Sequence, residues 1–300
     1  MQKVIVITGP TGVGKTKMSI ELAKALNTEI INGDAYQIYK YMNIGTAKPT
    51  NEEKQGIQHH LMDFLDPLSS FSICDYQKLV REKISDFDKN NKVPIIVGGS
   101  GLYIDSVLYD YRFTEDARNI EDEKKYDEYS NEELHNILKN LDSEAALKIH
   151  PNNRKRVLRA IELSQSNSSQ DERSLKNNPV YDFLLIFLND EREVLYERIN
   201  KRVDEMVETG LLEEVKSLYP GKLSNQAMKA IGYQEIIDYL DNKQSLDDAI
   251  NLIKQHSRNY AKRQLTWYRN HQNVKFIMID VNNLDNTKNE IIELTKEFLQ

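Results

Sequence analysis

The sequence predicts an α/β protein in which a parallel sheet is flanked by helices and interrupted by a mostly helical insertion domain. Short runs rich in β-branched and apolar residues, each bounded by turn residues, occur at 3–7, 29–31, 93–97, 182–188 and 274–279. Apolar runs of this length are typical of strands buried on both faces. Helical periodicity separates the runs, and strand–helix–strand units most often form a parallel sheet covered by helices.

The first helix is predicted to follow the first strand directly. Residues 15–26 place Met18, Leu22, Ala25 and Leu26 on one apolar stripe, as an amphipathic helix requires. The later chain is predicted to be helical over four further stretches, which are 191–219, 226–241, 245–271 and 286–299. The helical stretches thus alternate with most of the strand runs, as in a βαβ sheet.

The composition changes over residues 111–180 and returns at 182. Charged residues crowd together there, β-branched runs vanish, and helix-like segments occur at 131–140 and 152–164. We therefore expect a core built from 1–110 and 181–300, the latter with the C-terminal helices, and a helical insertion at 111–180 that contacts the substrate.

The composition excludes several classes of protein. With 39% hydrophobic and 29% charged residues among 300, the chain has a soluble globular composition. Cys74 is the single cysteine, so an internal disulfide or a cysteine-rich metal cluster is excluded and a reducing cytoplasm is expected. No stretch approaches the roughly 18 uninterrupted apolar residues of a membrane span. The net charge of −7 argues against indiscriminate nucleic-acid binding, although it allows one local basic groove.

The clearest motif lies between the first strand and the first helix and matches G-x-x-x-x-G-K-[ST]. Its glycines let backbone amides turn toward phosphate oxygens, and the helix N-terminus adds its positive end. Lys15 supplies a mobile cation, and the Thr16 hydroxyl can ligate Mg²⁺. The motif predicts a P-loop NTPase-like core that binds a di- or triphosphate through Gly9, Pro10, Thr11, Gly12, Val13, Gly14, Lys15 and Thr16.

Kinases, ATPases and GTPases share this loop, so the loop alone does not identify the phosphate compound. Hydrolytic P-loop proteins usually end a later strand with an aspartate that holds Mg²⁺ through water. Here the run at 93–97 continues into Gly98-Gly99-Ser100-Gly101 without a carboxylate, and the chain has no guanine-reading Asn-Lys-x-Asp. An ordinary ATPase or GTPase is therefore disfavoured.

Two polar residues are expected at the same edge of the sheet as the phosphate loop. Asp34 follows the second strand run, at the crevice where open parallel sheets bind their ligands. A carboxylate there can accept a proton from an attacking nucleophile, although capping of the next segment is an equal alternative. Ser100 follows the third run and is expected to face the same crevice. The alternative is that Ser100 serves only as a turn residue.

Five segments together resemble the signatures of the bacterial tRNA dimethylallyltransferase family, over nearly the whole chain and in order. They are the phosphate loop, Asp34–Tyr39 continuing through Met42–Pro49, His59–Asp63, Val97–Tyr103 and Ala261–Trp267. The resemblance implies transfer of a dimethylallyl group from dimethylallyl diphosphate to N6 of the adenosine 3′ of the anticodon. It also implies that the phosphate loop holds a diphosphate leaving group rather than ATP.

The resemblance further implies the roles of the catalytic residues. Asp34 matches the catalytic aspartate of the family and would take the N6 proton as the C–N bond forms. Ser100 stands where the family usually has threonine and would contact the nucleotide or the diphosphate. Lys15, the loop amides and Mg²⁺ held on Thr16 would neutralise the charge that grows on the leaving group. Mg²⁺ is the one cofactor expected.

The expected partner is the tRNA anticodon stem-loop, whose adenine must be extruded into a channel. By resemblance and by local basic charge, we predict RNA contacts at Asp34, Ala35, Tyr36, Gln37, Lys155, Arg156, Arg159, Lys229, Arg258, Lys262 and Arg263. Lys229 replaces an arginine that is common in the family, which keeps the charge and loses the bidentate fork. Lys124 is the best match to a further family arginine. No membrane contact and no obligate protein partner are expected, so we predict a monomer.

Two other interpretations stay open from the residues alone. One is a P-loop small-molecule or nucleoside kinase that uses ATP, with Asp34 as the base for a substrate hydroxyl. The other is an RNA-binding clamp whose phosphate loop is merely structural. The pair His59-His60 suggests a metal site, but adjacent residues rarely chelate one ion together, so a structural role is favoured.

Overall fold

The computed structural model describes residues 1–113, 125–165, 178–271, 273–280 and 283–300. The chain divides into two compact units. The first unit combines Met1–Leu108 with Pro179–Gln300, and the second is Tyr109–Asn178. The described helices include none that is long and apolar enough to cross a membrane.

The first unit is built on a six-stranded sheet whose neighbouring strands are all parallel, in the order β3-β2-β4-β1-β5-β6. The strands are β1 (Lys3–Thr8), β2 (Ile30–Asn32), β3 (His59–His60), β4 (Ile95–Val97), β5 (Asp182–Asn189) and β6 (Val274–Met278). The predicted α/β fold with a parallel sheet is confirmed. Strand β3 was not predicted, because two residues are too few to show a strand pattern.

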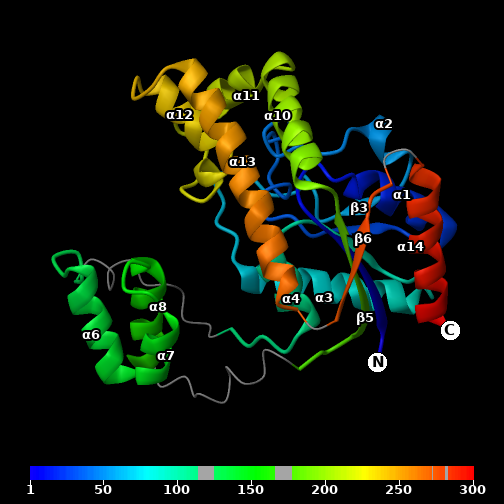
Figure 1. Ribbon diagram of the computed structural model, residues 1–300, viewed down its shortest axis with the longest axis horizontal. Coiled ribbons are helices and arrows are strands. Elements are labelled where there is room, and N and C mark those ends of the chain that lie inside the picture. The colour runs from blue at the N-terminus through cyan, green and yellow to red at the C-terminus, as the bar shows by residue number, and fades with distance from the viewer. Residues whose placement is uncertain (114–124, 166–177, 272, 281–282) are drawn as a thin grey trace. The chain divides into compact units, whose positions relative to one another are not determined.

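Helices cover the sheet and extend beyond its carboxyl edge (Figure 1). Isoleucines of β1 share one core cluster with Met18 and Leu22 of α1 and Ile291 of α14. The helices α3 and α4 pack against each other, as do α10 and α13, and α12 and α13. The helices are α1 (Lys15–Ala25), α2 (Asn51–Lys54), α3 (Ile73–Lys89), α4 (Gly101–Leu108), α10 (Arg192–Glu208), α11 (Leu211–Leu218), α12 (Tyr233–Leu240), α13 (Leu246–Arg269) and α14 (Leu284–Leu299), with a 3₁₀ turn η2 at Ala227–Lys229.

Two of the predicted long helices are broken by glycine. The stretch 191–219 divides into α10 and α11 at Gly210, whose φ is 106°. The stretch 226–241 divides into η2 and α12 at Gly232, whose φ is 97°. Positive φ is accessible to glycine at little cost, so the chain turns there while apolar periodicity continues on either side.

Helix α3 is absent from the sequence prediction although its start carries a recognisable signal. The Ser72 hydroxyl accepts from the backbone N–H of Asp75 at 3.1 Å, and the Asp75 carboxylate accepts from the Ser72 N–H at 2.8 Å. This reciprocal pair is a capping box, which a Ser-x-x-Asp spacing could have revealed. The helix brings Tyr76 beneath the carboxyl edge, where its hydroxyl donates to the Asn32 carbonyl at 2.9 Å.

The second unit contains α6 (Asn131–Leu141), α7 (Ser143–Lys148) and α8 (Arg154–Gln165) around a core of its own. Leu134 and Leu138 of α6 pack in this core with Val157 and Ile161 of α8. The Arg154 guanidinium donates to backbone carbonyls of the segment that precedes α6, so it stabilises the unit itself. Lys124 lies outside the described residues.

Candidate active site

The carboxyl ends of β2 and β4 meet at two glycines. A Cβ added to Gly98 would lie 2.1 Å from both the carbonyl carbon and the oxygen of Gly33, so the two backbones touch. The Gly33 N–H donates to the Val97 carbonyl at 2.7 Å, and the Ser100 N–H donates to the Gly33 carbonyl at 3.3 Å. Asp34 and Ser100 follow these glycines, so the contact fixes both at one edge.

The Asp34 carboxylate is oriented by its own loop. Its Oδ1 accepts from the backbone N–H groups of Tyr36 at 2.8 Å and Gln37 at 3.3 Å. The Asn32 side chain accepts from the Asp34 N–H at 3.1 Å and donates to the carbonyls of Asp34 and Leu61. Asp34 therefore caps a turn rather than a helix, and its Oδ1 atom accepts both of the capping hydrogen bonds. Within the described residues, Oδ2 makes no hydrogen bond.

Ser100 and helix α13 complete the wall around Asp34. The Ser100 hydroxyl accepts from the Ala35 N–H at 3.1 Å, which ties the β4 turn to the Asp34 loop. Tyr260 of α13 places its hydroxyl 3.4 Å from the Gly99 carbonyl. Burial raises the pKa of Tyr260, and the Asp34 carboxylate raises it further, so the phenol stays neutral beside that charge.

The phosphate loop, residues 9–16, is held in place by α13. The Gln264 side chain accepts from the Thr11 N–H at 3.2 Å and donates to the Gly99 carbonyl at 2.9 Å, so it joins this loop to the β4 turn. The Lys15 ammonium donates to the carbonyls of Gly9 and Pro10, both at 2.9 Å. Lys15 is thus held against the carbonyls of the loop itself.

Arg202 of α10 belongs to the same site, and sequence reasoning missed it. Its guanidinium lies 3.5 Å from the Thr11 hydroxyl and is largely buried. Burial and the Arg202 charge lower the pKa of Lys15 to about 8, while the Asp34 carboxylate opposes that change. Two cations and one carboxylate therefore share one electrostatic environment at the phosphate loop. No local pattern marks Arg202, because only the course of α10 brings it there.

Thr16 offers one protein oxygen for a metal ion. It lines a small cavity of about 20 Å³ with Asn32 and Gln37 at the carboxyl edge. In the part of the chain that the structure describes, no three His, Cys, Asp or Glu side chains are placed to hold a metal ion. The Thr16 hydroxyl is a ligand of the kind that Mg²⁺ takes, since this ion is usually held by few protein groups together with substrate phosphates and waters. His60 instead pairs with Glu29 at 2.5 Å.

The basic residues predicted to contact RNA differ in what they touch. Arg258 donates to the Asn200 side chain at 2.5 Å, so it is held against α10, and Arg263 lies over the Tyr260 ring at 5.6 Å from its centroid. Lys229 is exposed on η2. In the second unit Arg159 pairs with Glu162 at 3.0 Å, whereas Lys155 and Arg156 are exposed on α8.

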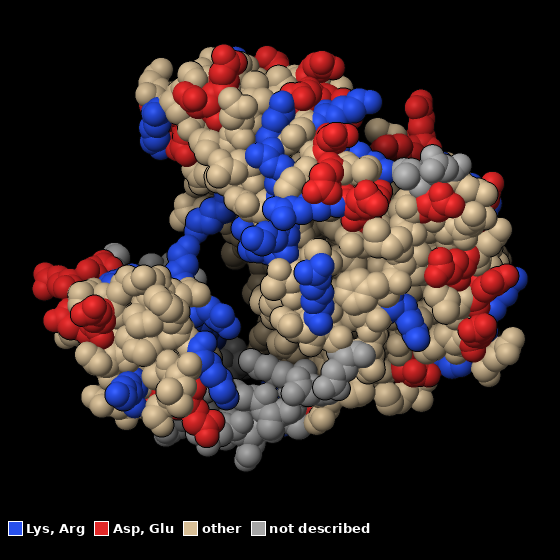
Figure 2. Space-filling model, viewed as in Figure 1, with Lys and Arg blue, Asp and Glu red and all other residues tan. Residues whose placement is uncertain are grey.

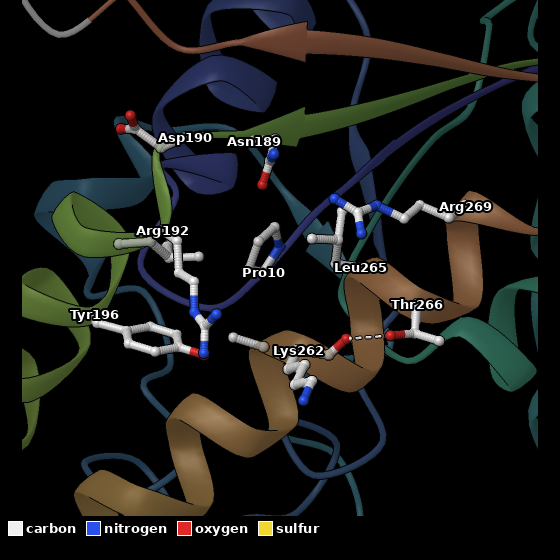
Figure 3. A pocket seen from close by; sticks show the side chains of 11 residues that line it. Pro10, Asn189, Asp190, Arg192, Tyr196, Lys262, Leu265, Thr266 and Arg269 are labelled. Carbon is white, nitrogen blue, oxygen red and sulfur yellow. Dashed lines mark hydrogen bonds between the residues drawn. The ribbon is translucent and has the colours of Figure 1, made fainter.

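A separate pocket of about 300 Å³ lies between α10 and α13, beside Pro10. Figure 3 shows Arg192 and Tyr196 of α10 opposite Lys262 of α13, with Arg269 nearer the end of α13. The Arg192 guanidinium lies over the Tyr196 ring at 5.1 Å. In the space-filling view, Lys and Arg side chains gather over this region (Figure 2). Lys262 thus lines a basic pocket, and neither Asp34 nor Ser100 contributes to it.

Comparison with known proteins identifies the family. The chain matches the IPP transferase family over residues 37–271. It is 51% identical over 281 residues to the tRNA dimethylallyltransferase of Bacillus subtilis (strain 168), with 91% of this chain and 90% of that protein covered. The corresponding enzyme of Bacillus licheniformis is 49% identical over 297 residues, with 96% and 95% covered.

Solved structures agree with the sequence comparison. A full-length tRNA isopentenylpyrophosphate transferase from Bacillus halodurans matches with a TM-score of 0.76 and 42% identity, covering 100% of this chain and 97% of that one. A eukaryotic dimethylallyltransferase, solved acting on tRNA, matches with a TM-score of 0.85 and 30% identity, covering 100% and 80%. The chain therefore belongs to the IPP transferase family.

Proposed function

We propose that this chain transfers a dimethylallyl group from dimethylallyl diphosphate to N6 of the adenosine 3′ of the anticodon in tRNA, releasing diphosphate. The family membership supports the reaction class. The observation that carries the proposal is the grouping of Lys15 and Arg202 with the Asp34 carboxylate at the phosphate loop. Such a site can stabilise an anionic leaving group and accept a proton within one crevice.

The cations act on the leaving group. When the bond between the allylic carbon and the diphosphate oxygen breaks, negative charge grows on the diphosphate and positive charge on the allyl group. The Lys15 ammonium, the Arg202 guanidinium and the amides of residues 12–16 are the donors that would stabilise this diphosphate. Because these groups are already fixed by the loop, α10 and α13, they need little reorganisation as the charge develops.

Asp34 acts on the nucleophile. The N6 amine of adenine is a weak nucleophile, since its lone pair is delocalised into the ring, and it must lose a proton when the C–N bond forms. Asp34 Oδ1 is occupied by two backbone amides, which leaves Oδ2 to accept that proton. Ser100 keeps the loop in place through Ala35, and its hydroxyl, which also bonds with the Tyr260 phenol, would contact the substrate.

Mg²⁺ would be held by the Thr16 hydroxyl together with diphosphate oxygens, and it supplies further neutralisation of the leaving group. The RNA would be held by exposed cations, including Lys155, Arg156, Lys229 and Lys262. We further propose that the chain acts as a monomer. We also propose that the reaction takes place in the cytoplasm.

The test is an incubation of the purified protein with unmodified tRNA and either radiolabelled dimethylallyl diphosphate or radiolabelled ATP. We expect the label of dimethylallyl diphosphate to enter tRNA, and enzymatic digestion to recover it as N6-dimethylallyladenosine. Transfer of the γ-phosphate of ATP to a small molecule or nucleoside would indicate a kinase instead. Binding of tRNA with no transfer from either donor, and no effect of Asp34→Ala, would indicate an RNA-binding clamp.

A further inference from the structure

The Ile44–Pro49 block carries much of the family resemblance, yet none of its side chains takes part in the chemistry described above. In the structure, residues 43–48 form a compact turn. The Lys48 N–H donates to the Asn43 carbonyl at 3.0 Å, and the Ala47 N–H donates to the Ile44 carbonyl at 2.9 Å. The Lys48 ammonium donates to the Asp63 carboxylate at 2.6 Å, which fastens the end of this 43–48 turn.

The start of the 43–48 turn is held by one carboxylate, that of Glu214 in α11. Three successive backbone N–H groups converge on it. Asn43 donates to Oε2 at 2.8 Å, Ile44 donates to Oε2 at 2.8 Å and to Oε1 at 3.1 Å, and Gly45 donates to Oε1 at 3.0 Å. Consecutive amides that point to one side form an anion-binding concavity, and here the anion is part of the same chain.

Glu214 also holds the segment on the other side of the turn. The Tyr233 hydroxyl donates to Glu214 Oε1 at 2.5 Å, and the Tyr233 ring is fully buried against Gly45. A Cβ added to Gly45 would lie 2.4 Å from Cε2 of that ring, so glycine is required for the contact. Tyr233 begins α12, four residues after Lys229, a predicted RNA contact. One carboxylate therefore anchors both segments.

The 43–48 turn in turn holds Gln37, another predicted RNA contact. The Gln37 side-chain amide donates to the carbonyls of Thr46 and Ala47, both at 3.1 Å. Those two bonds use both of its N–H groups, so the orientation of the side chain is fixed by the turn. The Gln37 backbone N–H donates to Asp34 Oδ1 at 3.3 Å. A continuous set of hydrogen bonds therefore leads from Glu214 to the proposed base.

We propose that Glu214 is a positioning residue for tRNA recognition. It fixes the 43–48 turn, which orients Gln37 next to Asp34, and it ties the segment of Lys229 to the same anchor. Glu214 itself touches neither the phosphate loop nor Asp34, so its effect falls on RNA binding and spares diphosphate binding. This inference rests on the proposed function, because it assigns Gln37 and Lys229 to the RNA-binding surface.

The test compares Glu214→Gln with Glu213→Gln in the full-length protein. The control makes the same charge change at the neighbouring, exposed position of α11. The amide of Glu214→Gln loses the charge and turns an NH₂ group toward backbone N–H groups. We expect its Kd for unmodified tRNA to rise about 10-fold, because three backbone N–H groups lose their charged acceptor. The Kd for dimethylallyl diphosphate should not change, and the control should match the wild type in both.

A double-mutant cycle separates positioning from general stability. The cycle measures the effect of Glu214→Gln on the Kd for tRNA in two backgrounds, the wild type and the Gln37→Ala variant. If Glu214 acts through Gln37, the rise in Kd should be far smaller in the Gln37→Ala background. Full additivity, or a Glu214→Gln variant that binds tRNA as Glu213→Gln does, would overturn the inference. If Glu214→Gln does not fold, Tyr233→Phe removes only the hydroxyl bond. It should weaken tRNA binding in the same direction, and wild-type binding by Tyr233→Phe would also overturn the inference.

The wild-type assay distinguishes this inference from the proposed function. If the wild type binds tRNA and transfers no dimethylallyl group, the proposed function is wrong. If the wild type transfers the group and the Glu214 and Glu213 variants behave alike, the function stands and the role of Glu214 is wrong.

Discussion

The buried ammonium of Lys15 should make diphosphate binding depend on pH. Burial and the Arg202 guanidinium lower the pKa of Lys15 from the usual 10.5 to about 8, against the opposing effect of Asp34. One unit of pKa corresponds to about 1.36 kcal/mol, so the lowered pKa means that the protein disfavours the charged form of Lys15 by roughly 3 kcal/mol. A bound diphosphate places negative charge beside the ammonium and should raise its pKa again.

The direction of the pH dependence follows from this difference. Below about pH 8, Lys15 is protonated in both the free and the bound protein, so affinity for dimethylallyl diphosphate is constant. Above it, the free lysine is neutral and binding must take up a proton, so affinity should fall about tenfold per pH unit. The last ionisation of a phosphate ester lies near pH 6, so the substrate charge does not change in this range.

Calorimetric titration of dimethylallyl diphosphate from about pH 7 to about pH 9.5 measures both affinity and proton uptake. Two buffers of different ionisation enthalpy are needed to count the protons. Lys15→Arg keeps its charge throughout and should show flat affinity, whereas Lys17→Ala, at an exposed neighbouring position, should keep the wild-type break. Constant affinity of the wild type across this range, with no proton uptake, would refute the reasoning.

Four other predictions follow from the site. Asp34→Asn keeps an Oδ1 acceptor for the Tyr36 and Gln37 amides and should lower the single-turnover rate by ~10²–10⁴, the usual contribution of a general base, with tRNA affinity retained; a near-normal rate would remove Asp34 from the mechanism. Thr16→Ala should blunt the response of activity to Mg²⁺, and a wild type indifferent to EDTA would contradict the metal role. Removal of charge at Lys155 and Arg156 should weaken tRNA binding and flatten its salt dependence, by a slope of ~0.7 for each single-strand phosphate that the protein no longer neutralises. If the salt dependence of tRNA binding did not change, Lys155 and Arg156 would be surface residues without a role in RNA binding. Lys15→Met should raise Tm, since it removes the penalty on a buried ammonium, while diphosphate binding is abolished; a lower Tm would contradict that penalty.

Much of the fold could be predicted because its signals are local. Runs such as Val4–Ile7 are apolar on both faces, and they became the central strands. Two of the errors arose where a single backbone conformation decided the outcome. Gly210 and Gly232 interrupt helices whose apolar periodicity continues on both sides, so periodicity alone did not reveal the breaks.

The site residues likewise fall into those that local sequence signals could place and those that they could not. The motif at 9–16 and the strand end at Asp34 could be placed together, because the carboxyl ends of parallel strands share one edge. Arg202 and Gln264 could not, because their roles depend on where α10 and α13 cross the sheet. Gln264 contacts Thr11 across 253 positions of sequence and Gly99 across 165. Contacts of that separation leave no pattern in a single sequence.

The contact between Gly33 and Gly98 bears on how such a site can change over evolutionary time. With the two backbones touching, no side chain can enter at Gly98. We therefore expect variation in the side chains that follow, of which Ser100 is the first. We expect a saturation library to accept several residues at Ser100 and none but glycine at Gly98. At this edge of the sheet, selection can therefore change the size and chemistry of the side chains, whereas the path of the main chain is fixed.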